Sequence, residues 1–426
     1  MYNKYKERGG KMNKEHFKLD KLQLHDSRVF RDPIHNYIHI NHLLFWQLIN
    51  TREIQRLRRI KQLGGTFQVY QSAEHSRFTH SLGVYEIVRR MIEETEIKQY
   101  LSDYDMATVL CAGLCHDLGH GPYSHSFEQV FLTHHETITV DIILGDTEVN
   151  QILTRYHPDL PNDVAQVIEK KHPNKVLVQM VSSQIDADRM DYLLRDSYFS
   201  GTTYGQFDLA RILRTLRLVD HQIVYKNSGV QAIENYILAR YHMYWQVYYH
   251  PTARSFEQLL SQVFKRIKDL YQDGFDFETD IRYLLPFLKN QWDYRDYLNL
   301  DESVVQYYFR CFSDSKDPIL SDLSRRFLDR HLLKHQDYHD PKEVEQLSKI
   351  ALEKGFDPNY YIITDNQRQI PYKHYGTDGA IEDIKILMDD QKTLKDLPEV
   401  SEIVDAIVRS KRNKTDQKVY YPKEIK

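Results

Sequence analysis

Hydrophobic residues recur at helical spacing over most of the chain between about residue 40 and residue 340. Residues 106–118 are almost wholly apolar, which predicts a helix buried in the middle of a domain. This helix must stop at Gly119 to Pro122, because that sequence cannot continue a helix. Further helices are expected over residues 51–60, with Thr51 as the N-cap, and over residues 81–91, 176–198 and 232–249. The pattern predicts a mainly α-helical protein.

Extended segments are short and few. Residues 37–40 are expected to be extended, and residues 222–226 to form a short strand or hairpin. After about residue 341 the pattern changes, and residues 360–364 and 419–421 predict strands with a helix near residues 399–409 between them. We therefore expect a flexible tail over residues 1–27, a helical core with short β-hairpins over residues 28–340, and a smaller C-terminal α+β lobe over residues 341–426.

Composition narrows the class of protein. Hydrophobic residues make up 41% and charged residues 28%, which is ordinary for a soluble globular protein. The net charge of −4 provides no general attraction to nucleic acid or to an anionic membrane, so neither is an expected partner. The 3 cysteines are poor material for a disulfide framework and suit a reducing compartment. No apolar run approaches the roughly 20 residues needed to span a bilayer, and the first residues do not resemble a signal peptide. We expect a cytoplasmic protein.

Candidate chemistry begins where the apolar helix ends, at His116 and Asp117. Two adjacent metal-competent side chains at the end of a buried helix need something that compensates their polarity. Neighbouring side chains on a helix point about 100° apart, so these two cannot complete a metal shell alone. His80, at the start of a helix, and Asp188, within the helix expected over residues 176–198, are the candidate further ligands. Two imidazoles and two carboxylates suit a divalent cation such as Mn, Mg, Fe, Co or Zn.

The order of these residues resembles the signature of the HD superfamily, and five longer blocks resemble a narrower group. That group is the deoxynucleoside triphosphate triphosphohydrolases, which include the vertebrate protein that joins a sterile-alpha-motif to an HD domain. The blocks are Asp32–His35, Gln55–Gly64, Arg77–Val84, His116–His125 and Asp188–Tyr192. The resemblance covers about residues 28–260 strongly. Because no sterile-alpha-motif fits before residue 28, the bacterial members are the nearer comparison. The resemblance implies an HD-type helical core.

The resemblance implies a metal centre. The implied ligands are His80, His116, Asp117 and Asp188. The metal would polarise the α-phosphate of the substrate and lower the pKa of a bound water, which would then act as the nucleophile. Attack at the α-phosphorus would release a deoxynucleoside and intact triphosphate.

The resemblance also implies four catalytic residues. His125 is the implied general acid for the leaving 5′-oxygen, and Glu128 is placed to orient it. The family often has aspartate at the position of Glu128, so glutamate there is a departure. His120 and His135 match histidines that face the phosphates, although a histidine at such a position can also be a simple helix-end or surface residue.

Substrate contacts follow from the same resemblance. Arg77, Arg189 and Arg240 match residues that hold the phosphates. The residues that match the surroundings of the sugar are Gln62, Leu63, Tyr192, Asp196 and Tyr248. A tyrosine packed beneath the 2′ carbon would exclude ribose, and Asp196 and Gln62 can hydrogen-bond the 3′-hydroxyl. Tyr248 could equally be a core residue, since its segment contains many aromatic side chains.

A second implied site binds an activating nucleotide between subunits. Its residues are Arg28, Asn50, Gln55, Arg58, Arg330 and Lys334. This implies a (d)GTP-like activator and a homotetramer. Asn50 replaces an aspartate that reads guanine in the vertebrate member, which changes the donor pattern offered to the base. The basic run that contains Arg58 could instead be a solvated helix face.

Two alternatives remain open on the sequence alone. One is another HD phosphohydrolase that acts on signalling nucleotides or nucleoside monophosphates. The second is a nucleotide sensor without catalytic activity. Arg77, Arg240 and Tyr248 favour triphosphate hydrolysis, since a simpler HD phosphodiesterase would not need them. His125 and Glu128 argue against a pure sensor, which has no use for a general acid.

Overall fold

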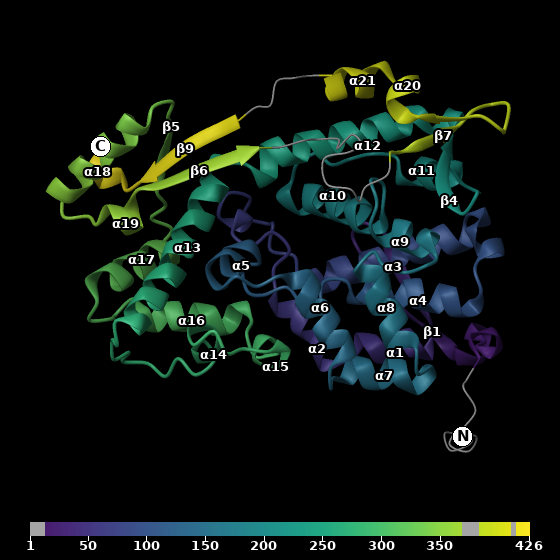
Figure 1. Cartoon of the computed structure of the whole chain (residues 1–426), viewed down its shortest axis with the longest axis horizontal. Helices are drawn as coiled ribbons and strands as arrows, with labels where there is room; N and C mark the ends of the chain where they lie inside the picture. Colours follow the sequence, from purple (N-terminus) through teal and green to yellow (C-terminus); the bar gives the residue numbers. More distant parts are fainter. Residues whose placement is uncertain (1–12, 369–382, 410–414) are drawn as a thin grey trace.

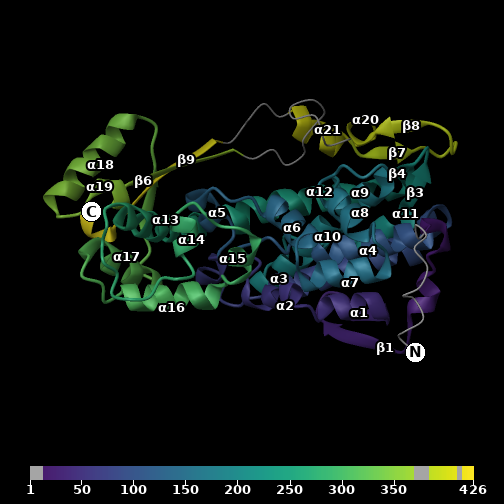
Figure 2. The same cartoon turned by 60° about the horizontal axis from the view of Figure 1, so that its bottom comes forward.

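The structure is a computed structural model that describes residues 13–368, 383–409 and 415–426. Helices dominate these residues and the strands form small sheets, as the hydrophobic pattern predicts (Figure 1). The first half of the chain forms one end of the elongated molecule, and helices α13 to α19 extend to the other end (Figure 2). Among the described residues, no helix is both long enough and apolar enough to cross a membrane.

Three helices form the centre of the first half. They are α3 (Arg77–Glu93), α4 (Asp103–Cys115) and α10 (Ala187–Ser200), with α3 packed against both of the others. Helix α4 is the predicted apolar helix, and every residue from Met106 to Cys115 is buried. It begins three residues earlier than expected, because Ser102 and Asp105 form a capping box at its N-terminus. Helix α4 ends at Cys115, so His116 and Asp117 lie just beyond its last turn.

The prediction of a single helix over residues 176–198 is wrong. The chain forms α9 (Lys175–Val181) and then α10, with a break between them. Asp186 causes the break: one carboxylate oxygen accepts from the N–H of Arg189 at 2.7 Å and the other accepts from the N–H of Ser183 at 2.7 Å. A side chain that caps the backbone in this way competes with helix continuation. The break places Asp188 in the first turn of α10 rather than in the middle of a helix.

The N-terminal region is more ordered than expected. Strand β1 (Gln23–Asp32) pairs antiparallel with β2 (Asn36–His42), which contains the predicted extended segment. Residues 13–27 were expected to belong to a flexible tail, but Phe17 and Leu19 are buried in the core. Phe17 packs edge-on against Tyr104 at 5.6 Å between ring centroids, which anchors this segment. Residues 1–12 lie outside the described residues.

Short helices follow the N-terminal hairpin. Helices α1 (Leu43–Ile49) and α2 (Arg52–Arg56) come first, and Thr51 caps α2 as predicted by accepting from the N–H of Ile54. The expected helix to Ile60 ends instead in a 3-10 turn at Leu57–Arg59. The remaining helices of this half are α5 (His125–Phe131), α6 (His135–Leu144), α7 (Glu148–Tyr156), α8 (Leu160–Ile168) and α11 (Leu209–Thr215).

A long helical segment links the two ends of the molecule. Helix α12 (Val230–Met243) continues into a π-helical turn at Tyr244–Tyr248, and α13 (Pro251–Gln272) follows. Wide turns of this kind occur frequently at functional sites. The helices beyond α13 in the core are α14 (Leu285–Leu288), α15 (Tyr294–Leu298), α16 (Glu302–Phe312) and α17 (Pro318–Leu328).

The C-terminal residues lie in two places rather than in one lobe (Figures 1 and 2). Strands β5 (Lys334–Asp337), β9 (Thr415–Tyr421) and β6 (Ile363–Arg368) form one sheet in that order, near α18 (Pro341–Glu353) and α19 (Pro358–Tyr361). Residues 360 and 361, expected in a strand, are the last residues of α19. Because β5 precedes residue 340, this sheet crosses the expected domain boundary, and the division at residue 340 stays a prediction.

The other C-terminal segment joins the first half of the molecule. Strands β7 (Lys385–Leu387) and β8 (Leu394–Asp396) extend the hairpin of β3 (Leu216–Val219) and β4 (Gln222–Lys226), giving the order β3-β4-β7-β8. Strand β7 runs parallel to β4. Helices α20 (Leu397–Val400) and α21 (Glu402–Arg409) follow, and α21 packs against α12.

Candidate metal centre and adjoining pocket

Three helix ends bring two histidines and an aspartate together. His80 lies in the first turn of α3, His116 directly follows α4, and Asp188 lies in the first turn of α10. His80 Nε2 is 3.1 Å from Asp188 Oδ1 and 3.2 Å from His116 Nε2. The three ligand atoms all lie within 4.8 Å of one another, so this group could hold a metal ion. The side chain of Asp188 is 33% exposed, which leaves an approach from outside.

Asp117, the fourth predicted ligand, lies at the edge of this group. Its Oδ1 is 3.4 Å from His116 Nε2, and its Oδ2 is 3.9 Å from His80 Nε2. Arg77 Nη1 donates to Asp117 Oδ2 at 2.6 Å. The structure therefore brings all four predicted ligands to one place, with Asp117 shared between the histidines and Arg77.

The orientation of both histidine rings suits metal binding. His116 Nδ1 is 2.9 Å from the carbonyl oxygen of Gly113, an acceptor that holds the proton on Nδ1. His80 Nδ1 is 2.8 Å from Asp191 Oδ2, which holds its proton in the same way. Each ring then directs Nε2 toward the other ring and toward Asp188. Metal-bound histidines commonly have this arrangement, in which the second nitrogen is fixed by a carboxylate or a carbonyl.

Electrostatic interactions within the group favour the charged state. Burial opposes ionisation of Asp188, yet hydrogen bonds from His116 and His80 hold its pKa far below the usual range. Burial also opposes protonation of His80, but hydrogen bonds to Asp188 and Asp191 raise its pKa to about 10. Two imidazole nitrogens and a carboxylate oxygen thus face one another, and a divalent cation bound to these donors would displace the proton of His80.

A second histidine–carboxylate group lies next to the first. The rings of His120 and His135 stack with centroids 3.9 Å apart. Glu128 Oε1 is 3.0 Å from His135 Nδ1 and 3.8 Å from His120 Nδ1. Burial and the nearby charge of Arg77 lower the pKa of His120 well below its ordinary value. His120 Nε2 is 3.3 Å from Asp117 Oδ1, so His120 connects the two groups.

The predicted role of Glu128 as the partner of His125 stays a prediction. His125 is the first residue of α5, but its side chain lies outside the described residues. The contacts described for Glu128 are with His135 and His120.

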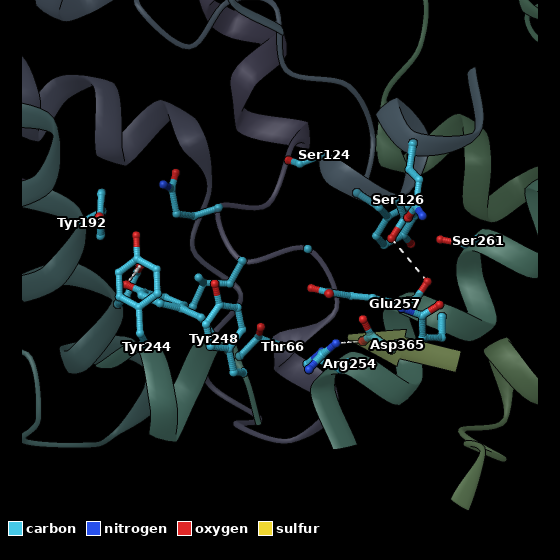
Figure 3. A pocket seen from close by; sticks show the side chains of 18 of the residues that line it. Thr66, Ser124, Ser126, Tyr192, Tyr244, Tyr248, Arg254, Glu257, Ser261 and Asp365 are labelled. Carbon is cyan, nitrogen blue, oxygen red and sulfur yellow. Dashed lines mark hydrogen bonds and ion pairs between the residues drawn. The ribbon is translucent and has the colours of Figure 1, made fainter. Parts of the chain in front are cut away.

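A cavity of about 510 Å³ adjoins the metal centre. That volume is within the range of about 300–1,000 Å³ typical of small-molecule sites. Tyr192, Tyr244 and Tyr248 lie on one side of it, and Arg254, Glu257 and Asp365 lie on the other (Figure 3). The predicted substrate residues in its wall are Gln62, Leu63, Arg77, Tyr192, Asp196 and Tyr248.

The residues predicted to contact the sugar hold one another in place. Asp196 Oδ2 accepts from the hydroxyl of Tyr248 at 2.7 Å, and Asp196 Oδ1 is 2.7 Å from His75 Nε2. The ring of Tyr192 meets that of Tyr248 edge-on at 6.2 Å. The amide oxygen of Gln62 is buried and has no hydrogen-bond partner among the described residues. A buried acceptor of this kind costs free energy unless a ligand or water satisfies it.

Of the three arginines predicted to hold phosphates, Arg77 is the one in the described wall of the cavity. Arg189 pairs with Asp186 and donates to the carbonyl of Ser183 at 2.7 Å. Arg240 Nη1 donates to Gln184 Oε1 at 3.2 Å. Neither arginine is among the described residues that line the cavity, and the charges of both lower the pKa of Tyr192, which does line it, against the larger rise caused by burial.

Several residues of the cavity wall were not predicted. They are Tyr244, which lies on the side of Tyr192 and Tyr248, and Tyr249, Arg254, Glu257 and Asp365. Asp365, on strand β6, forms an ion pair with Arg254 on α13. Tyr244 is one helical turn before Tyr248, so spacing could have identified it. No local signal connects Asp365 to residues more than one hundred positions earlier in the chain.

The predicted activator residues divide between two places. Arg28 lies over the ring of Trp46 at 5.8 Å, and Asn50 Nδ2 donates to the carbonyl of Trp46 at 2.7 Å. Arg58, in the 3-10 turn that follows α2, donates from Nε to Oε1 of Gln55 in α2 at 2.9 Å. Arg330 donates to the carbonyl of Gln68 at 2.9 Å, and Lys334 is exposed on β5. A site shared by two subunits remains a prediction.

The fold and the paired His-Asp ligands define an HD-domain protein. Residues 77–196 match the HD domain family and residues 207–283 match the HD associated region. The first match contains the four candidate ligands, at the helix ends described above. The chain belongs to the HD-domain phosphohydrolase superfamily.

Within that superfamily the chain is similar to proteins from several organisms. The uncharacterized protein YwfO of Bacillus subtilis is 47% identical over 408 residues, which cover 95% of this chain and 94% of YwfO, and the two belong to one family. The deoxynucleoside triphosphate triphosphohydrolase SAMHD1 of Gallus gallus is 30% identical over 58% of this chain and 46% of that protein. A phosphohydrolase structure from Bacteroides thetaiotaomicron matches with a TM-score of 0.81 at 29% identity, over 93% of this chain and 99% of the other. The family resemblance expected from the motifs is confirmed.

Proposed function

We propose that this protein hydrolyses deoxynucleoside triphosphates at the α-phosphate in a reaction that depends on a divalent metal. The position of Arg77 carries the proposal: its side chain lines the cavity and donates to Asp117 beside the candidate metal ligands. A phosphate bound by Arg77 would lie between those ligands and the predicted sugar residues. The relatives named as deoxynucleoside triphosphate triphosphohydrolases support this substrate class.

In the proposed reaction a water oxygen forms a bond to the α-phosphorus, and the bond from phosphorus to the 5′-oxygen breaks. A metal held by His80, His116, Asp117 and Asp188 would supply Lewis acidity and lower the pKa of the attacking water. His125 would donate a proton to the leaving 5′-oxygen. Glu128 would orient His125, and His120 and His135 would face the phosphates from the neighbouring group.

Selection for deoxyribose would come from the part of the cavity wall that contains Gln62, Tyr192 and Tyr248. Tyr192 and Tyr248 would pack against the deoxyribose, and the buried amide oxygen of Gln62 would accept from the 3′-hydroxyl. Arg189 and Arg240 would contact phosphate only after releasing their present partners, Asp186 and Gln184.

Regulation and assembly complete the proposal. A (d)GTP-like nucleotide would bind where Arg28, Asn50, Gln55 and Arg58 of one subunit meet Arg330 and Lys334 of another, within a homotetramer. The cytoplasmic location expected from the cysteine content belongs to the same proposal, as does the choice among Mn, Mg, Fe, Co and Zn.

The test is to incubate the purified protein with each of the four dNTPs and Mn²⁺ or Mg²⁺, with and without dGTP or GTP. We expect intact triphosphate and a deoxynucleoside, detected by ³¹P NMR and chromatography, and no product from the Asp188→Ala variant. Metal-bound protein that releases no triphosphate under any combination would overturn the proposal. Hydrolysis of a cyclic nucleotide, an alarmone or a nucleoside monophosphate instead would favour the other HD phosphohydrolase activities.

A further inference from the structure

A fully buried carboxylate, Asp191, lies directly behind the metal ligand His80. Asp191 Oδ2 is 2.8 Å from His80 Nδ1, and Asp191 Oδ1 is 2.7 Å from His35 Nε2. The side chain of Asp191 is 0% exposed, and those of both histidines are 1% exposed. One carboxylate therefore contacts two imidazoles in the interior, and one of the two presents its other nitrogen to the metal centre.

Asp191 is itself held in place by Arg195. Arg195 donates from Nε to Asp191 Oδ2 at 2.8 Å and from Nη2 to Asp191 Oδ1 at 2.9 Å, a two-pronged contact one helical turn along α10. The third nitrogen of the guanidinium, Nη1, donates to Asp32 Oδ2 at 2.7 Å. A planar guanidinium with two such contacts fixes both the position and the plane of the carboxylate.

The motif Asp32–His35 closes this network from the N-terminal hairpin. Asp32 Oδ1 accepts from the backbone N–H groups of Ile34 at 2.9 Å and His35 at 3.0 Å, which shapes the turn between β1 and β2. The turn delivers the ring of His35 to Asp191. This motif has no part in the proposed reaction, so the network gives it a role.

Gly83 on α3 leaves room for the side chains of Asp191 and Arg195. Gly83 lies on α3 one turn after His80, and a Cβ added there would be 1.9 Å from Asp191 Oδ1 and 2.5 Å from Arg195 Nη2. No side chain can occupy that space while Asp191 keeps its position. The glycine therefore permits the close approach of α10 to α3 at this level.

We propose that Asp191 is a positioning residue for the metal centre, which fixes the ring of His80 and raises its affinity for a divalent cation, and that Asp32, His35 and Arg195 hold it there. This inference rests on the proposed metal centre but not on the identity of the substrate. Replacing the carboxylate behind a metal-bound histidine commonly weakens metal affinity by about 10–100-fold.

The primary test compares Asp191→Asn with a matched buried aspartate. Asp163 is buried and accepts from the hydroxyl of Tyr104 at 2.7 Å, away from the metal centre. We would measure the dissociation constants for Mn²⁺ and Co²⁺ by competition with a chelator, together with the visible spectrum of the Co²⁺-loaded protein. We expect Asp191→Asn to weaken binding about 10–100-fold and to alter the Co²⁺ spectrum, while Asp163→Asn leaves both unchanged. Circular dichroism without metal verifies folding.

A second pair of variants keeps the inference testable if Asp191→Asn does not fold. Gly83→Ala retains every ligand and every charge, and displaces Asp191 together with the Arg195 guanidinium that holds it. Gly113→Ala on α4 is its control, because a Cβ there would meet its nearest neighbour, Val88, at 3.4 Å. We expect Gly83→Ala to weaken Co²⁺ binding about tenfold or more, and Gly113→Ala to leave it unchanged.

The outcomes separate this inference from the proposed reaction. Folded Asp191→Asn or Gly83→Ala protein that binds metal as tightly as the wild type would overturn the inference, as would equal losses in each variant and its control. Wild-type protein that binds no divalent cation would overturn it as well. Wild-type protein that binds metal with the expected dependence on Asp191, but releases no triphosphate, would overturn the proposed reaction alone.

Discussion

Arg56 and His120 are joined by a buried hydrogen bond, in which the guanidinium Nη1 of Arg56 donates to the carbonyl oxygen of His120 at 2.9 Å. Arg56 also donates from Nε to the carbonyl of Leu300 at 2.8 Å. The side chain of Arg56 is fully buried, and burial lowers its pKa to about 10. The short helix α2 thus supports the loop that follows the His-Asp pair, and links that loop to the segment before α16.

The first prediction concerns this arginine. Arg56→Gln should lower the free energy of unfolding by about 3 kcal/mol, because it leaves buried carbonyls without donors. Arg52→Gln on the same helix is the control and should change stability by less than about 0.5 kcal/mol, since Arg52 is exposed. Urea denaturation measures both, and equal stability of the two variants would contradict the supporting role of Arg56.

Metal binding should stabilise the fold only while Asp188 is present. Saturating Mn²⁺, at about one hundred times the dissociation constant, should raise the free energy of unfolding by about 2.7 kcal/mol in the wild type. Chelation should remove the gain, and Asp188→Ala should show none. Thermal unfolding with and without Mn²⁺ provides the measurement. Asp141→Ala, which changes an exposed aspartate of α6, should behave as the wild type does.

Loss of the general acid should slow turnover without loss of metal. His125→Ala should reduce turnover by about 10²–10⁴ while metal content stays at the wild-type level. His134→Ala is the matched control, since His134 is an exposed histidine at the start of α6. Turnover of dNTP and metal content are measured on the same preparations. Unchanged turnover of His125→Ala would remove His125 from the mechanism.

The substitution Gln62→Leu should increase stability and weaken substrate binding. Gln62→Leu removes a buried oxygen that has no hydrogen-bond partner among the described residues, so the free energy of unfolding should rise by about 1 kcal/mol. The same substitution removes a proposed acceptor for the 3′-hydroxyl, and KM should rise about tenfold. Denaturation and steady-state kinetics test the two effects separately. A fall in stability together with an unchanged KM would show that Gln62 is a packing residue.

Glu302 should make stability depend on pH. Burial raises the pKa of Glu302 to about 7 from an ordinary 4.5, against the opposing effects of the N–H and the charge of Lys61. Below about pH 4.5 the residue is protonated in both the folded and the unfolded chain, and its full contribution to stability is present. Between pH 4.5 and 7 only the folded protein keeps the proton, so stability falls as pH rises, by about 3 kcal/mol in total.

Glu302→Gln tests that dependence. Glutamine keeps an acceptor for the N–H of Lys61 at 2.9 Å but does not titrate. The difference in the free energy of unfolding between variant and wild type should therefore grow from pH 5 to pH 8. Glu343→Gln, in the half-buried capping box of α18, should show no such growth, because backbone hydrogen bonds lower the pKa of Glu343 and it stays ionised over this range. Parallel pH profiles for Glu302→Gln and the wild type would contradict the prediction.

The sequence predicted that the candidate metal ligands lie together, because they occur in local patterns. His80, His116 and Asp188 each lie at a helix end within a recognisable block, and the structure brings them together as expected. The break before Asp188 was missed, because the hydrophobic spacing of residues 176–198 continues through it. Hydrogen bonds of Asp186 to the backbone end the first helix, and such capping competes with spacing in ways that periodicity alone does not reveal.

Contacts between distant parts of the chain were beyond prediction. Asp365 reaches the cavity only because β6 pairs with β9 and passes α13. Strand β7 joins β4 in parallel, which divides the expected C-terminal lobe between two places. Phe17 and Leu19 anchor a segment whose composition suggests a tail, and their burial depends on Tyr104 and its neighbours. Each of these features is a tertiary interaction without a local signature.

The ion pair between Arg254 and Asp365 belongs to a part of the cavity wall that lies far along the chain from the candidate metal ligands. The candidate metal ligands come from residues 80–188, whereas this wall of the cavity combines α13 with a strand near the end of the chain. Substitutions in β6 could therefore change which molecules fit without disturbing a single metal ligand. A fragment restricted to the HD domain would keep its ligands and lose that wall. Related chains could thus acquire new substrates by altering their last hundred residues.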